Sequence, residues 1–295
     1  MSDAAPVTSA GRARLARVEQ VMGMPVVIEV CDVDVDDSAV ERVYRWLRYV
    51  DSTFSTYDES SEISRLNRGE LDLSDASLAV RSVLERCASL RDWTAGFFDI
   101  TASMPGGGVD PSGLVKGWSV AGGARLLKQA GARNFCIDAG GDIIVSGQAP
   151  QGGPWRIGVA HPLLRDAIAC TVALSDAAIA TSGTYERGAH IIDPRTGAAA
   201  NGLLAVTVIG PDLPLADAFA TAAFAMGRDA PDWCARQRGL EFMLVTDDEQ
   251  MLTTAGFEHY RVREPVAARR KDSRTPAPSS ATASLAGLPR RPARR

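Results

Sequence analysis

Two residues near the end of the chain combine the side chains and the spacing of a metal site. Asp217 and Thr221 stand four residues apart in the segment ADAFATAAFAMG, residues 216–227, whose alanines and closing glycine predict a helix. Residues four apart lie one above the other on the same helix face, so a carboxylate and a hydroxyl would be neighbours. Such hard oxygens suit Mg²⁺, which usually leaves room for substrate phosphates. The segment therefore predicts phosphate chemistry.

A second segment, HIIDPRTG at residues 190–197, places a histidine and Asp193 where a short β-like run enters a proline-containing turn. Because imidazole titrates near neutral pH, His190 could act as a general base or hydrogen-bond a phosphate oxygen. The alternative is a histidine that only ends a strand. Its sequence neighbours favour the first interpretation. His161 and His259 lie outside any such group and are assigned no role.

The composition is that of an ordinary globular protein. The 295 residues are 45% hydrophobic and 23% charged, which is ample for one large core or two closely joined subdomains. The five cysteines never pair as CxxC, so neither a disulfide framework nor a zinc site is indicated. No stretch approaches the roughly 20 apolar residues that span a bilayer, and no apolar segment precedes a cleavage site near the N-terminus. We expect a cytoplasmic location without a membrane anchor.

The net charge of −4 conceals an uneven distribution. From residue 266 onward the chain has eight Lys or Arg residues against Asp272, a net of +7, which leaves residues 1–265 at −11. The segment 263–295 lacks the apolar periodicity needed to bury a face, so we expect a disordered basic tail. Such a tail could contact nucleic acid or anionic lipid, but it has no interleaved aromatic residues. A solvated tail is favoured, and no nucleic-acid partner is expected.

The remaining patterns predict the elements that would position these residues. Helices are expected near residues 38–50, 77–93, 117–130 and 216–227, and short strands at 26–30, on both sides of Gly140 and Gly141, and at 155–160, 169–175, 178–183, 190–194, 205–210 and 241–246. Most strands are grouped together and most helices are set apart from them. The pattern indicates an α+β fold with mixed, largely antiparallel sheets covered by helices on one side.

Eight segments, taken in their order along the chain, resemble the ApbE family. These segments are MGMPVVIEV (22–30), FSTYDESSEISRLN (54–67), GFFDIT (96–101), DPSGLVKGWSV (110–120), IDAGGDIIVSG (137–147), TSGTYER (181–187), HIIDPRTG (190–197) and ADAFAT (216–221). The resemblance covers roughly residues 20–255 and implies an ApbE-like, T-fold-like architecture. It also implies a flavin transferase domain at 20–262, preceded by a flexible N-terminus at 1–19 and followed by the tail.

Members of that family are FAD:protein FMN transferases, formerly labelled thiamine biosynthesis lipoproteins, and the resemblance implies site residues position by position. The implied FAD contacts are Met22, Tyr57, Phe97, Phe98, Asp99, Asp110, Lys116, Gly140, Gly141, His190 and Ile191. The implied metal ligands are Asp217, Thr221 and the backbone carbonyls of Gly113 and Ala220. The implied catalytic residues are His190 and Asp193. Flat apolar walls suit a flavin ring, and an ammonium suits a diphosphate. The paired glycines equally mark a hairpin turn.

The resemblance implies a Mg²⁺-dependent transfer of FMN from FAD to a Thr or Ser hydroxyl of a client flavoprotein, with AMP as the leaving group. Two alternatives stay open, namely a Mg²⁺-dependent FAD pyrophosphatase that releases FMN and AMP, and a non-catalytic FAD-binding protein. The segment between GFFDIT and DPSGLVKG is shorter than is usual in the family, with only residues 102–109 intervening. We expect this to shorten one wall of the cleft.

Overall fold

Most strands of the structure belong to one open antiparallel sheet. The computed structural model describes residues 15–164, 167–184 and 191–263. Within them the sheet has eight strands in the order β1-β2-β3-β4-β7-β8-β9-β10, and β5 and β6 form a separate hairpin. The bounds are Leu15–Val21 (β1), Met24–Val30 (β2), Phe135–Ala139 (β3), Asp142–Ser146 (β4), Trp155–Ala160 (β5), Ile168–Leu174 (β6), Ala177–Gly183 (β7), Leu203–Gly210 (β8), Glu241–Thr246 (β9) and Met251–Thr253 (β10).

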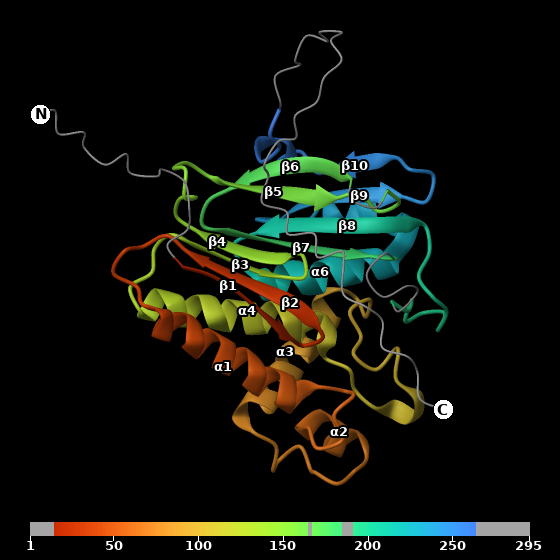
Figure 1. Cartoon of the computed structure of the whole chain (residues 1–295). Coiled ribbons are helices and arrows are strands. Elements are labelled where there is room, and N and C mark those ends of the chain that lie inside the picture. The colour runs from red at the N-terminus through yellow and green to blue at the C-terminus, as the bar shows by residue number, and fades with distance from the viewer. Residues whose placement is uncertain (1–14, 165–166, 185–190, 264–295) are drawn as a thin grey trace, which may run out of the picture. The chain divides into compact units, whose positions relative to one another are not determined.

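Helices cover one face of this sheet (Figure 1). The helix α1 packs against β1, α4 against β3 and β4, and α6 against β4, β7 and β8. The helix bounds are Asp37–Phe54 (α1), Glu62–Asn67 (α2), Leu78–Trp93 (α3), Ser112–Gln129 (α4), Leu213–Met226 (α6) and Ala230–Cys234 (α7). Short 3₁₀ turns occupy Pro105–Gly107, Gly227–Asp229 and Phe257–His259. The α+β fold with antiparallel sheets and helices on one side is thus confirmed.

The central strands are buried on both faces, because the sheet separates two cores. In β7 and β8, Ala178 and Val208 belong to the core beneath the helices, whereas the adjacent Ile179 and Ile209 belong to a second core. The second core also contains Trp155 of β5, so the β5–β6 hairpin covers the face opposite the helices. Alternate side chains of a strand point to opposite faces, and here both sets are apolar.

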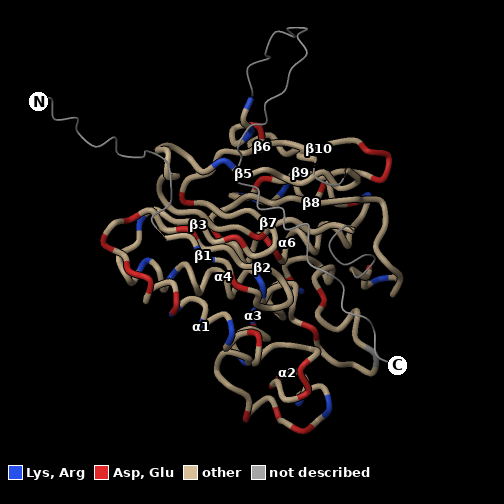
Figure 2. The backbone as a smooth tube through the Cα atoms, in the orientation of Figure 1, with Lys and Arg blue, Asp and Glu red and all other residues tan. Residues whose placement is uncertain are grey.

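The helix α1 shows how local sequence fixes an element. Its N-cap Asp36 accepts a hydrogen bond from the backbone N–H of Ala39, which satisfies one otherwise unpaired helix donor. Charged residues of both signs occur along α1 (Figure 2). Among them, Glu41 pairs with Arg17 of β1 at 2.8 Å. Partly exposed pairs of this kind add little stability, so the apolar inner face of α1 is what holds it on the sheet.

The structure corrects several expected boundaries. The strand β1 begins at Leu15, so residues 15–19, expected to belong to a flexible N-terminus, are part of the sheet. The helix α4 begins at Ser112, five residues before the expected residue 117. The run at 190–194 is not a strand in its described part, because Ile192 makes only an isolated bridge with Ala199. The expected disorder of the tail stays a prediction, since residues 264–295 lie outside the described ranges.

The crossing of α1 and α4 requires a residue without a side chain. A Cβ atom at Gly122 of α4 would lie 2.7 Å from Cε2 of Trp46 in α1, and the Trp46 indole is fixed by donating to the carbonyl of Ser119 at 2.8 Å. We therefore expect Gly122→Ala to lower the free energy of unfolding by about 1–3 kcal/mol, measured by urea denaturation.

The matched control for this prediction removes the indole. In a Trp46→Leu background the same Gly122→Ala change should be neutral or stabilising, because alanine is favoured over glycine in a helix by about 1 kcal/mol. If Gly122→Ala lowered the free energy of unfolding equally in both backgrounds, the contact with Trp46 would not be the cause of the destabilisation.

Candidate active site

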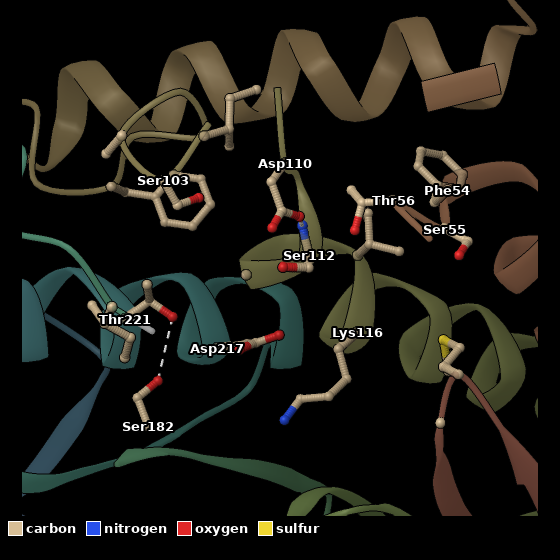
Figure 3. Close-up of a pocket in the computed structure, with 18 of the residues that line it drawn as sticks. Phe54, Ser55, Thr56, Ser103, Asp110, Ser112, Lys116, Ser182, Asp217 and Thr221 are labelled. Carbon is tan, nitrogen blue, oxygen red and sulfur yellow. Dashed lines mark hydrogen bonds between the residues drawn. The ribbon is translucent and has the colours of Figure 1, made fainter. Parts of the chain in front are cut away.

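One pocket of about 580 Å³ lies where the ends of several elements meet. Its walls come from the β1–β2 turn, the end of α1, the loop from Phe97 to Ser103, the first turns of α4, the middle of α6 and the end of β7 (Figure 3). This volume is in the range of small-molecule sites. Eleven of the predicted site residues line it: Met22, Tyr57, Phe97, Phe98, Asp99, Asp110, Gly113, Lys116, Ile191, Asp217 and Thr221.

The helix α6 presents two oxygen donors to this pocket. Its start is fixed by Asp212, whose side chain accepts a hydrogen bond from the backbone N–H of Leu215. Asp217 and Thr221 then follow one turn apart and both line the pocket. The hydroxyl of Ser182, at the end of β7, lies 3.3 Å from that of Thr221 (Figure 3). Three oxygen-bearing side chains from two elements therefore border the same space.

The helix α4 approaches α6 closely, so that backbone groups of α4 lie beside Asp217 and Thr221. The N–H of Gly117 donates to Asp217 Oδ2 at 2.9 Å, and a Cβ atom at residue 117 would lie 3.0 Å from the carbonyl oxygen of Leu213. One turn earlier, a Cβ atom at Gly113 would lie 3.5 Å from Thr221 Oγ1. Glycine at position 117 lets the two helices approach, which brings the first turn of α4, with Gly113, beside the α6 oxygens.

A buried ion pair lies beneath these donors. Lys116 of α4 lines the pocket, and its Nζ is 2.9 Å from Oδ2 of Asp142, the first residue of β4. Asp142 is fully buried, and its Oδ2 accepts no well-formed hydrogen bond from the described residues. Burial raises the pKa of the Asp142 carboxyl, and the Lys116 ammonium opposes that shift. The charge of Lys116 is thus what stabilises ionised Asp142.

Apolar side chains form another part of the pocket wall. Phe97 and Phe98 are buried in its wall, and the guanidinium of Arg195 lies 4.0 Å from the ring centroid of Phe97. Met22 has a φ of 54°, a left-handed conformation that is uncommon outside glycine. Its backbone N–H donates to Asp51 Oδ2 at 3.1 Å, which ties the β1–β2 turn to the end of α1. These groups supply flat walls suited to an aromatic ring.

The two predicted aspartates of the adjoining loops have local hydrogen bonds. Burial raises the pKa of Asp99, but its hydrogen bonds from Thr101 and the nearby Arg91 outweigh burial and hold the pKa below its usual value. Asp110 accepts the backbone N–H of Ser112 at 3.0 Å, at the start of α4. Both carboxylates therefore shape the pocket wall as well as facing its space.

Among the described residues, four of the predicted ones do not line the pocket. Gly140 and Gly141 form the two-residue β3–β4 turn with φ values of 60° and 95°, which is the geometry of a hairpin. Asp193 accepts the N–H of Arg195 at 2.9 Å within its own turn. Ala220 is fully buried in α6. His190 lies outside the described residues.

The tyrosine and the shortened loop lie at the edge of the pocket. Tyr57 lines the pocket and is 90% exposed, so its ring is available to a ligand that enters. Ala102 and Ser103, from the segment expected to shorten one wall, are also lining residues. The short segment therefore contributes to the wall, with the Pro105–Gly107 turn beyond it.

Several residues of the site were not found from the sequence. Asp142, Ser182 and Asp51 were assigned no role, although each contacts a predicted site residue. The one available signal was at Asp142, an acidic residue that directly precedes the apolar run IIV and follows a glycine turn. A charge at the start of a buried strand requires a partner, and the sequence does not identify that partner.

The donor set limits which cation could bind. In the described ranges no three His, Cys, Asp or Glu side chains gather as metal ligands. A cation here would depend on the Asp217 carboxylate together with hydroxyl and carbonyl oxygens. Mg²⁺ fits this set, because it is commonly bound by one or two carboxylates and completes its shell with water and phosphate.

Over the same part of the chain, no helix is both long and apolar enough to cross a membrane.

Comparison with known proteins gives relatives of one kind. A model of the ApbE family matches residues 22–105 and 102–244. The FAD:protein FMN transferase of Haemophilus influenzae is 28% identical over 177 residues, covering 56% of this chain and 51% of that protein. That of Vibrio cholerae is 33% identical over 164 residues, covering 52% and 47%. The chain thus spans about half the length of these curated relatives.

A solved structure gives the same result for the fold. The ApbE protein of Thermotoga maritima superposes with a TM-score of 0.76 at 22% identity, covering 84% of this chain and 99% of that one. At this identity the likeness establishes a shared fold.

Proposed function

The chain belongs to the ApbE family, and we propose that it transfers the FMN part of FAD to a Thr or Ser hydroxyl of a client flavoprotein, releasing AMP. The observation that most supports this is the pairing, in one pocket, of an aromatic wall with a group of hard oxygens beside a lysine. The wall suits a flavin ring, and the polar end suits a diphosphate. Relatives named as FAD:protein FMN transferases support the same activity.

Mg²⁺ is proposed as the cofactor, held by Asp217, Thr221 and the carbonyl of Gly113. Their proximity across the α4–α6 crossing supports this set. Ala220 is a further proposed ligand through its carbonyl. When bound, the cation would supply positive charge that stabilises the negative charge developing on the diphosphate.

The chain's own groups bind and orient the substrate. Phe97, Phe98 and Met22 hold the flavin ring, with Tyr57 at the open edge, and Lys116 offsets phosphate charge. Asp99, Asp110 and Ile191 complete the wall around FAD. Gly140 and Gly141 remain proposed FAD contacts through a neighbouring turn.

The reaction is a phosphoryl transfer. The client hydroxyl oxygen forms a bond to the phosphorus of the FMN phosphate, the bond from this phosphorus to the bridging oxygen breaks, and AMP leaves with that oxygen. The hydroxyl proton passes to His190, or to Asp193 nearby in the same segment. Catalysis then depends mainly on positioning and on charge stabilisation.

The test is co-expression of the chain with a flavoprotein of its own organism, followed by intact-protein mass spectrometry. A mass increase equal to esterified FMN, lost when the acceptor Thr is replaced by Val, supports the transferase. Purified protein incubated with FAD and Mg²⁺ alone gives the complementary measurement. Free FMN and AMP without a labelled client would indicate a pyrophosphatase, and intact FAD with no labelled client would indicate a binding protein.

A further inference from the structure

Asp142 is a charged residue at the junction of the elements that build the pocket. It begins β4, its Oδ1 is 3.4 Å from the backbone N of Thr181 in β7, and its Oδ2 is 2.9 Å from Lys116 Nζ in α4. Three elements, β4, β7 and α4, thus meet at one carboxylate that is not itself part of the pocket lining.

A carboxylate in this position cannot be explained by packing. Burying an ionised carboxylate is unfavourable unless the charge is paired, and an apolar residue would fill the same space without that cost. The role of the Asp142 charge must therefore lie in its interaction with neighbouring residues. Of these, Lys116 is the group of opposite charge, and its side chain is 16% exposed where it borders the pocket.

The proposed metal site creates a need for such a partner. Lys116 and a divalent cation bound at Asp217 would be two positive centres in one pocket, where like charges repel. Without a second carboxylate, the Lys116 ammonium would compete with the cation for Asp217. Asp142 supplies a second carboxylate on the side of Lys116 away from solvent.

We propose that Asp142 is a positioning residue that holds the Lys116 ammonium and balances its charge, so that Asp217 can bind a divalent cation beside it. This rests on the metal site of the proposed function. It assigns a role to a residue that contacts neither the substrate nor the metal, and it makes Lys116 compatible with the cation.

The test measures binding of Mn²⁺ to the full chain without FAD, by the loss of free Mn²⁺ signal in electron paramagnetic resonance. We expect Asp142→Asn to weaken Mn²⁺ binding at least tenfold, because the amide keeps the shape of the side chain and removes its charge. In a Lys116→Met background, where no ammonium competes for Asp217, Asp142→Asn should weaken Mn²⁺ binding less than threefold. An equal loss in both backgrounds would overturn the proposal.

Two further variants separate charge from folding. Asp142→Glu should keep Mn²⁺ affinity within about threefold of the unmodified protein, since it restores the charge; a loss as large as that of Asp142→Asn would contradict the proposal. Glu29→Gln neutralises a half-buried carboxylate of β2 outside the pocket and should leave Mn²⁺ binding unchanged. Should Asp142→Asn not fold, the Asp142→Glu variant and the double variant decide the question by the same thresholds.

Failure of this proposal can be told apart from failure of the proposed function. Absence of Mn²⁺ binding by the unmodified protein would contradict the metal site and, with it, this inference. Normal Mn²⁺ binding by both the unmodified protein and Asp142→Asn would overturn only the role of Asp142.

Discussion

Replacing Asp217 with alanine is expected to abolish FMN transfer, lowering the rate by about a thousandfold, the magnitude typical of removing a main electrostatic contribution at an active site. Asp217 is the carboxylate of the oxygen group on α6, and Thr221 and the Gly113 carbonyl are neutral donors that bind a cation weakly alone. The rate is measured as AMP released from FAD in the presence of Mg²⁺ and a client. Full turnover by Asp217→Ala would rule out the metal site.

The control must separate this effect from a change in structure. Asp217 is buried and accepts the N–H of Gly117, so its removal also loosens the α4–α6 crossing. Asp212→Asn is the matched variant, because it removes a carboxylate from the same helix outside the main pocket while asparagine still caps the helix. We expect it to keep its transfer rate. A similar loss in both variants would indicate damage to α6 rather than to a ligand.

The elements that were predictable from the sequence are those with a strong local pattern. The helix α6 and the shared face of Asp217 and Thr221 follow from a run of alanines closed by Gly227, and the structure has both. The helices α1 and α3 follow from apolar residues at helical spacing. In each case residues within one or two turns determine the result, so no distant contact has to be known.

The features that were missed depend on distant contacts. The strand β1 alternates exposed and half-buried residues, and it is a strand because β2 pairs with it along its whole length. Asp142 acts on Lys116, which is 26 residues earlier, and the fold alone brings β4 beneath α4. Ser182 likewise meets Thr221 only because β7 packs on α6.

The family resemblance located residues that the local pattern could not. Tyr57 and Met22 are ordinary residues in their own segments, yet both line the pocket. It was less informative about Gly140 and Gly141, whose positive φ values are explained by the hairpin turn that they form. Their proposed contact with FAD therefore needs evidence of its own.

The second large effect concerns the stability of the ion pair itself. Lys116→Met should lower the free energy of unfolding by about 3–5 kcal/mol, because it leaves the fully buried Asp142 carboxylate without its counter-charge. Adding Asp142→Asn should recover most of that loss, since two neutral side chains of similar volume then replace the pair. Urea denaturation at pH 7 of both single variants and the double variant measures this.

Comparison with a second lysine of α4 identifies the cause. Lys128 is exposed in the last turn of the helix, so Lys128→Met should change the free energy of unfolding by less than about 0.5 kcal/mol. Adding Asp142→Asn to Lys116→Met could instead lower the free energy of unfolding further. The two side chains would then contribute to stability independently, and their pairing would not explain why they are buried. Recovery of stability together with loss of FAD binding would instead show that the pair is kept for the function of the pocket, because a neutral replacement folds equally well and lacks only the placed charge.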